Sequence, residues 1–226
     1  MSKTGSTTGR SIQTAEALKA RQREERNNYS EALGLRVHRA ISWLTRAEQC
    51  EDLDGCFVFL WISFNSAYSN DLSGISIAES EQFGSFIRKL VDLDSQQKLY
   101  STTWGKYSSA IRVLLGNKYV YQPFWNHHNR ISGYENWQSH FKASKQAANI
   151  ALANNDTAKV LRIIFTRLYT LRNQIIHGGA TWNSSANRDQ LRDATAILGD
   201  LVPILIEIMM DNEKAHWGDA CYPLVE

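Results

Sequence analysis

One short segment of this 226-residue sequence combines residue types that can bind a phosphate group and move a proton. It contains Arg172, Asn173 and His177 and ends at Gly178 and Gly179. Arginine binds phosphate oxygens bidentately, and histidine is the side chain that titrates near neutral pH. Together they offer a fixed positive charge for an anion and a side chain that can transfer a proton.

The residues before His177 have the spacing of an amphipathic helix. One stripe of this helix contains Leu161, Phe165, Leu168, Arg172 and Ile176. Asn173 and His177 are four residues apart and share a patch of surface, whereas Arg172 lies about 140° around the axis from His177. A guanidinium at the edge of a packing face needs a partner, either a carboxylate in a structural role or a phosphate.

In this context the segment resembles the R-x(4–6)-H motif of the HEPN superfamily of all-α proteins. Arg172 and His177 match the motif with four residues between them, and a polar residue such as Asn173 commonly follows the arginine. The aromatic run at 57–68 is similar to the second core helix of Apea-like HEPN proteins. Residues 177–190 are similar to their link into the next helix.

The resemblance implies a metal-independent endoribonuclease that needs no cofactor and acts as a toxin or in phage defence. The lack of an apolar signal-peptide core and of a long apolar stretch predicts that it is cytoplasmic. It implies that His177 is the general acid or base, that Arg172 stabilises the phosphorane, and that Asn173 orients the histidine or holds a phosphate oxygen. One histidine cannot be base and acid in the same step, so a homodimer would pool two motifs across its interface. RNA is the expected substrate, and an antitoxin or other regulator is a possible partner. The alternative is a non-catalytic module that binds RNA or a nucleotide, or acts as a scaffold.

A second group of candidates begins the last predicted helix. Ser185, Asn187 and Arg188 precede or open that helix, whose free N–H groups could hold an anion near His177. The alternative is that Ser184 or Ser185 only caps the helix.

An aromatic segment supplies a third group. His127, His128 and Arg130 lie among several tyrosine, phenylalanine and tryptophan residues and could stack bases and bind phosphate. The alternative is a packed surface loop. Adjacent histidines lack the spacing of zinc ligands on a helix, so we predict no metal site.

The elements that position these residues are predicted to be helices. The sequence predicts helical structure over 11–50, a buried helix over 55–68 with Asp52 or Asp54 as its cap, a break at Gly74, and helices over 79–94 and 95–115. It then predicts a loop over 116–134 with Pro123 as the breaker, and helices over 134–154, 157–177 capped by Asp156, and 186–213 kinked at Pro203. A buried strand is the rival interpretation of 55–68. The expected fold is an all-α bundle of six to seven helices.

Composition bounds the remaining classes. Residues 1–9 are predicted to be disordered, and 10–226 to form a single domain in which 75–155 holds an insertion or extra helices. The hydrophobic share of 43% and charged share of 21% are those of an ordinary globular protein. Three cysteines without a CxxC pair argue against a disulfide framework or a structural zinc site. The sequence predicts no signal peptide and no membrane span, and it contains no Walker loop or GxSxG motif.

Overall fold

The computed structural model describes residues 12–69, 79–185 and 187–222. Within these residues the chain forms ten α-helices and no β-strand, which confirms the all-α class. The expected count of six to seven is too low, because three helices of four to nine residues accompany seven longer ones. The expected disorder of 1–9 and the expected break at Gly74 lie outside the described residues.

The helices of eleven residues or more are α1 (Ala15–Glu25), α2 (Glu31–Glu48), α3 (Leu53–Tyr68), α4 (Glu79–Leu93), α8 (Trp137–Ala153), α9 (Thr157–Ile176) and α10 (Arg188–Asp211). The short ones are α5 (Lys98–Ser101), α6 (Ser108–Gly116) and α7 (Gln122–His128). Two 3-10 segments, η1 (Arg26–Asn28) and η3 (Lys118–Val120), and the π segment η2 (Thr102–Lys106) lie between them.

The N-terminal region forms two helices where the sequence predicted continuous helical structure over 11–50. After α1 and η1, the hydroxyl of Ser30 accepts a hydrogen bond from the Leu33 N–H at 3.2 Å and starts α2. A serine side chain that caps a new helix favours a break at that point. Leu18 is fully buried, so α1 packs on the rest of the molecule.

The aromatic run after Asp52 is a helix, α3, and the rival strand interpretation is wrong. The carboxylate of Asp52 caps it by accepting a hydrogen bond from the Gly55 N–H at 2.8 Å. Trp61 and Phe64 are fully buried, and the Phe64 ring lies 4.3 Å from that of Phe165 in α9. This aromatic contact joins the central helix to the helix that carries the motif.

Residues 79–93 form α4 as predicted, but the single helix predicted over 95–115 is wrong. Gln97 has a left-handed backbone, with φ of 53°, which interrupts the helical path. The carboxylate of Asp94 then accepts hydrogen bonds from the N–H groups of Lys98 and Leu99, at 3.0 and 2.7 Å. The segment continues as α5, η2 and α6.

The loop predicted over 116–134 is also wrong in part, because it contains η3 and α7. Pro123 lies in the first turn of α7, where its missing N–H costs no helical hydrogen bond. It therefore helps to start a helix instead of breaking one. Phe124 is buried, and its ring meets that of Trp137 edge-on with the centroids 5.0 Å apart.

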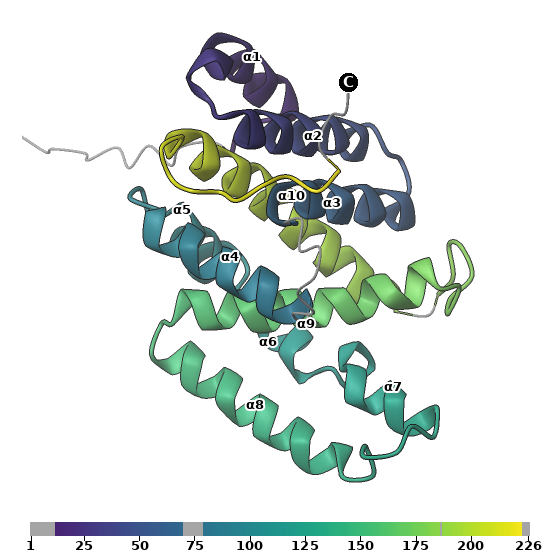
Figure 1. The fold of residues 1–226 in the computed structure, drawn as a ribbon. Coiled ribbons are helices and arrows are strands. Elements are labelled where there is room, and N and C mark those ends of the chain that lie inside the picture. The colour runs from purple at the N-terminus through teal and green to yellow at the C-terminus, as the bar shows by residue number, and fades with distance from the viewer. Residues whose placement is uncertain (1–11, 70–78, 186, 223–226) are drawn as a thin grey trace, which may run out of the picture.

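Helices α8 and α9 form a helical hairpin, and α9 lies between α4 and α8 (Figure 1). Asp156 caps α9 by accepting a hydrogen bond from the Lys159 N–H at 3.0 Å, as predicted. Arg167 of α9 is only 2% exposed and donates to the Ser144 hydroxyl of α8 at 3.0 Å. Burial lowers the pKa of Arg167 to about 10, so this guanidinium remains charged at neutral pH.

The last helix, α10, contains Pro203 and runs without interruption from Arg188 to Asp211. The segment after it returns to α2 and α3. The buried guanidinium of Arg36 donates to the carbonyl oxygens of Ala67 at 2.8 Å and Asp219 at 2.6 Å. Arg36 therefore ties the C-terminal segment to the end of α3.

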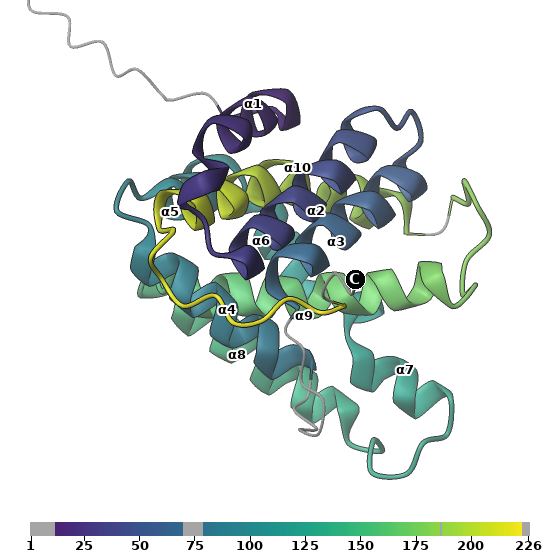
Figure 2. The same ribbon diagram turned by 45° about the horizontal axis from the view of Figure 1, so that its top comes forward.

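Most buried apolar side chains form one cluster, to which α1–α6 and α8–α10 contribute. Four of these helices, α4, α5, α6 and α8, lie within 75–155, so much of that region packs on the common core. In two views the C-terminal turn of α9 and the connection to α10 lie at one edge of the molecule (Figure 1, Figure 2). None of the described helices combines the length and apolar character needed to cross a membrane.

Candidate functional site

The end of α9 is fixed by the two glycines after His177, as the sequence predicted. Gly178 has a left-handed backbone with φ of 70°. Its N–H donates to the carbonyl of Ile175 at 3.2 Å, and the Gly179 N–H donates to that of Gln174 at 2.7 Å. This pair of hydrogen bonds is the Schellman motif, which satisfies the last carbonyl groups of a helix.

His177 is the C-terminal cap residue of α9, and its side chain is exposed. Its backbone N–H donates to the carbonyl of Asn173 at 3.0 Å. Two large apolar side chains are exposed nearby in the sequence, Ile176 at 47% and Trp182 at 73%. The histidine is thus accessible, on a part of the chain that also presents apolar surface.

The guanidinium of Arg172 is half-buried and is held by its own helix. Its Nη1 donates to the side-chain oxygen of Asn173 at 2.9 Å, and its Cζ lies 5.5 Å from the Tyr169 ring centroid. Its Nε is buried without a hydrogen-bond partner, and no carboxylate of the described residues lies within 4 Å of it. The carboxylate considered from the sequence is therefore not its partner among these residues, and the arginine keeps capacity to bind an anion.

A cavity of about 800 Å³ lies next to this end of α9. All of its lining residues are uncharged, and Asn173 is among them, whereas Arg172 and His177 are not. Its aromatic and amide lining includes Tyr119, Trp125, Asn129, Asn173, Gln174 and Asn187. Amides and aromatic rings suit a neutral planar group better than a phosphate.

Gln174 connects three segments at this cavity. Its Nε2 donates to the carbonyl of Tyr119 at 2.6 Å, and its Oε1 accepts a hydrogen bond from Asn187 Nδ2 at 2.9 Å. The indole N–H of Trp125 donates to the same Tyr119 carbonyl at 2.7 Å. The sequence analysis assigns no role to Gln174, because its partner is 55 positions away and no local pattern indicates the contact.

Comparisons of this chain with protein-family models, with curated proteins and with solved structures found no match. The HEPN resemblance therefore stays a hypothesis, carried by the residues of the motif. Within the described residues no group of three or more His, Cys, Asp or Glu side chains could hold a metal ion.

The predicted serine cap of the last helix is wrong. Asn187, and not Ser184 or Ser185, is the N-cap residue of α10. Its backbone is left-handed, with φ of 58°, and its side chain makes no capping hydrogen bond because it is bonded to Gln174. Ser185 is exposed in the connection between α9 and α10. Of the predicted anion-binding group, Asn187 lines the 800 Å³ cavity and Ser185 does not.

Arg188 is engaged within the fold. Its Nη1 forms an ion pair with Asp54 at 2.7 Å, and its Nε donates to the Ser184 carbonyl at 2.9 Å. Asp54 lies in the first turn of α3, so the pair joins the starts of α3 and α10. These contacts give Arg188 a structural role and leave less of its guanidinium for a substrate.

His127 and His128 are the last two residues of α7, and their rings contact aromatic side chains. The ring of His128 lies 4.1 Å from that of Phe124, and its Nδ1 is 2.8 Å from the Phe124 carbonyl oxygen. The ring of His127 lies 6.3 Å from that of Trp137. Arg130 follows in an exposed, left-handed turn with φ of 58°.

None of these three predicted residues lines the 800 Å³ cavity. Their neighbours Trp125 and Asn129 do. Gln122, Trp125 and Asn129 line the cavity because residues three and four apart share one face of a helix. His127 and His128 lie on other faces of α7, and Arg130 follows its end, which the loop prediction did not include.

Proposed function

We propose that this chain is a metal-independent endoribonuclease whose active site is completed in a homodimer. The observation that carries the proposal is the grouping of Arg172, Asn173 and His177 at one exposed end of α9. The side-chain oxygen of Asn173 accepts a hydrogen bond from the Arg172 guanidinium, and its backbone carbonyl accepts one from the His177 N–H. The arrangement offers a fixed positive charge and an accessible proton carrier on adjacent turns.

In the proposed reaction the RNA 2′-hydroxyl attacks the adjacent phosphorus, and the bond from phosphorus to the 5′-oxygen breaks. One His177 accepts the 2′-hydroxyl proton, and His177 of the second subunit donates a proton to the leaving oxygen. Arg172 stabilises the charge that builds on the phosphorane. The products carry a 2′,3′-cyclic phosphate and a 5′-hydroxyl.

A two-fold interface at the end of α9 would bring both motifs together. Exposed Ile176 and Trp182 support such an interface, because an isologous contact needs apolar surface that is identical on both partners. A chain that stays monomeric at micromolar concentration in light scattering would overturn the composite site.

The first experiment is RNA cleavage in excess EDTA by the wild-type chain, His177→Ala and His140→Ala. His140 is an exposed histidine on α8 and serves as the matched control. We expect cleavage by the wild type and the control, and loss of at least about a hundredfold in His177→Ala. Equal cleavage by all three proteins would overturn the proposal.

A second candidate function is a non-catalytic module that binds RNA or a nucleotide. The uncharged aromatic and amide lining of the 800 Å³ cavity favours it, because such a lining suits a nucleobase. Binding of RNA by His177→Ala and wild type alike, without cleavage by either, would support this function. The toxin or defence role is tested by growth arrest on expression that requires both Arg172 and His177.

A further inference from the structure

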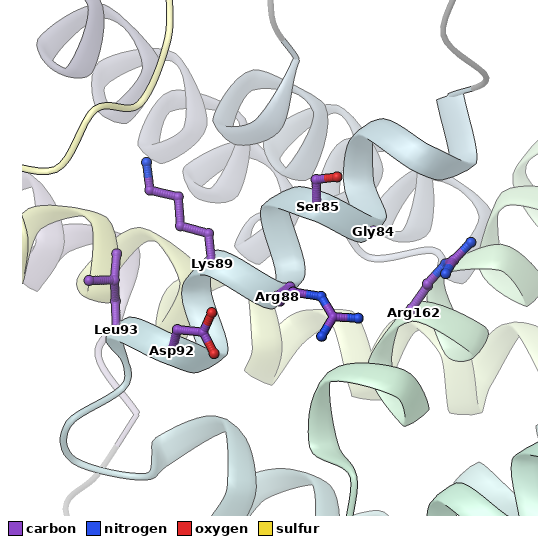
Figure 3. A pocket seen from close by; sticks show the side chains of 7 residues that line it. All are labelled: Gly84, Ser85, Arg88, Lys89, Asp92, Leu93 and Arg162. Atoms are coloured by element: carbon purple, nitrogen blue, oxygen red, sulfur yellow. The ribbon is translucent and has the colours of Figure 1, made fainter.

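A second cavity lies between α4 and the first half of α9. Arg162, which lines it, is about 22 Å from His177 along the axis of α9. Its volume is about 630 Å³. Figure 3 shows the side chains that line it. They belong to Ser85, Arg88, Lys89, Asp92 and Leu93 of α4, beside Gly84, and to Arg162 of α9.

Two exposed guanidinium groups reach the same space from different helices. Arg88 extends from α4 toward Arg162 on α9 (Figure 3). Neither group lies within 4 Å of a carboxylate of the described residues, although Asp92 lines the same cavity one turn after Arg88. Two like charges that face one cavity repel each other unless an anion lies between them.

Lys89 contributes less to this cavity. Its ammonium group donates to the carbonyl of His216 and lies 4.4 Å from the Trp217 ring centroid. In Figure 3 its side chain points away from Arg162. The charge that faces the cavity therefore comes from the two arginines, opposed by the single carboxylate of Asp92.

Gly84 creates the space in which Arg162 lies. A Cβ atom added at this position would lie 3.2 Å from both Cδ and Nε of Arg162. Glycine weakens the interior of a helix relative to alanine, so its presence in α4 needs a compensating reason. The close approach of the arginine side chain across α4 is such a reason.

We propose that Arg88 and Arg162 together bind a phosphate group in this cavity. Arginine presents a planar set of donors that matches phosphate oxygens, and two such groups can hold one phosphate from two sides. The phosphate comes from a free nucleotide-like ligand or from an RNA backbone. The proposal does not depend on the ribonuclease activity, since either ligand can bind without being cleaved.

The test measures the binding of two probes, inorganic pyrophosphate and a fluorescein-labelled single-stranded RNA dodecamer, to the full chain in EDTA. All proteins carry His177→Ala, so that RNA is not cleaved during the measurement. Arg88→Gln and Arg162→Gln are compared with Arg112→Gln, which removes an exposed arginine of α6 that does not line the cavity. Thermal unfolding checks that each variant is folded.

We expect each cavity variant to raise the Kd of at least one probe about tenfold, which corresponds to one charge-assisted contact, and Arg112→Gln to leave it unchanged. A loss confined to pyrophosphate identifies a free phosphate ligand, and a loss confined to RNA identifies the backbone. The proposal is overturned if neither probe binds, if the cavity variants bind normally, or if Arg112→Gln has the same effect.

Two further variants test the geometry and the sign of the charge. Gly84→Ala keeps every charge but displaces Arg162, so it should weaken probe binding while thermal stability is kept or increased. Asp92→Asn removes the opposing carboxylate and should strengthen binding. Unchanged affinity in both variants would also contradict the proposed site.

Discussion

The left-handed backbone at the end of α9 can be tested by replacing Gly178 with alanine and comparing the result with the same substitution at Gly199. A Cβ atom added at either glycine would meet no heavy atom within 4 Å, so neither substitution by alanine creates a clash. The two positions differ in backbone conformation. Gly178 has φ of 70°, whereas Gly199 lies in the interior of α10.

The expected effects have opposite signs. Holding alanine in the left-handed region costs roughly 1–2 kcal/mol, which is offset in part by the reduced freedom of the unfolded chain. We therefore expect Gly178→Ala to lower the free energy of unfolding by about 1 kcal/mol. Gly199→Ala should raise it by up to about 1 kcal/mol, because alanine is the better residue inside a helix. The difference of about 2 kcal/mol is roughly 30-fold in the folding equilibrium.

The assay is urea unfolding monitored by circular dichroism at a fixed temperature. The comparison requires that the free energy of unfolding depends on urea concentration with the same slope in each variant. Gly178→Asn is a useful third variant, because asparagine tolerates the left-handed region better than alanine and should fall between wild type and Gly178→Ala. If Gly178→Ala is as stable as Gly199→Ala, the Schellman ending of α9 is not the conformation in solution. The placement of His177 derived from it would then be wrong.

Two other perturbations test the buried polar groups. Arg36→Met should lower the free energy of unfolding by about 3 kcal/mol, because the carbonyls of Ala67 and Asp219 lose a buried charged donor; a loss below about 1 kcal/mol in urea unfolding would contradict this. Burial, aided by nearby Cys50 and Asp52, raises the pKa of the Cys56 thiol to about 11 from an ordinary value of 9.0. In the native chain at pH 8 iodoacetamide should therefore modify Cys56 about a hundredfold more slowly than in urea, as measured by peptide mass spectrometry. Because the folded pKa is the higher one, the stabilising contribution of this thiol is complete below pH 9 and is lost as the pH rises toward 11. Equal modification rates in the two states would contradict the burial.

Local sequence signals predicted the helices whose ends are set by neighbouring residues. Asp52 and Asp156 cap α3 and α9 through N–H groups three positions ahead, and Gly178 ends α9. These contacts span a few residues and depend on intrinsic preferences of the side chains, so the sequence pattern contains the information. The aromatic run of α3 is also predicted as a helix, because apolar residues occur all round it and no hairpin signal follows it.

Predictions failed where a residue's role depends on a distant partner. Asn187 replaces the serines as the first residue of α10 because its side chain bonds Gln174 on another helix. Pro123 opens α7 instead of ending a segment, since aromatic packing against α8 stabilises a helix in that place. The local preferences of the serines and of Pro123 are real, but contacts with residues distant in the sequence determine which structure forms.

The candidate site divides in the same way. The sequence alone determined that Arg172, Asn173 and His177 gather at the end of one helix, because helical geometry fixes neighbours at a spacing of one to five residues. The packing of the helices added that the Arg172 guanidinium contacts Asn173 and Tyr169, and that Arg188 forms an ion pair with Asp54. The packing of α4 against α9 also places Arg88 and Arg162 at the same cavity. Such contacts depend on how α3, α4, α9 and α10 pack, and packing is a property of the whole core that no short pattern encodes.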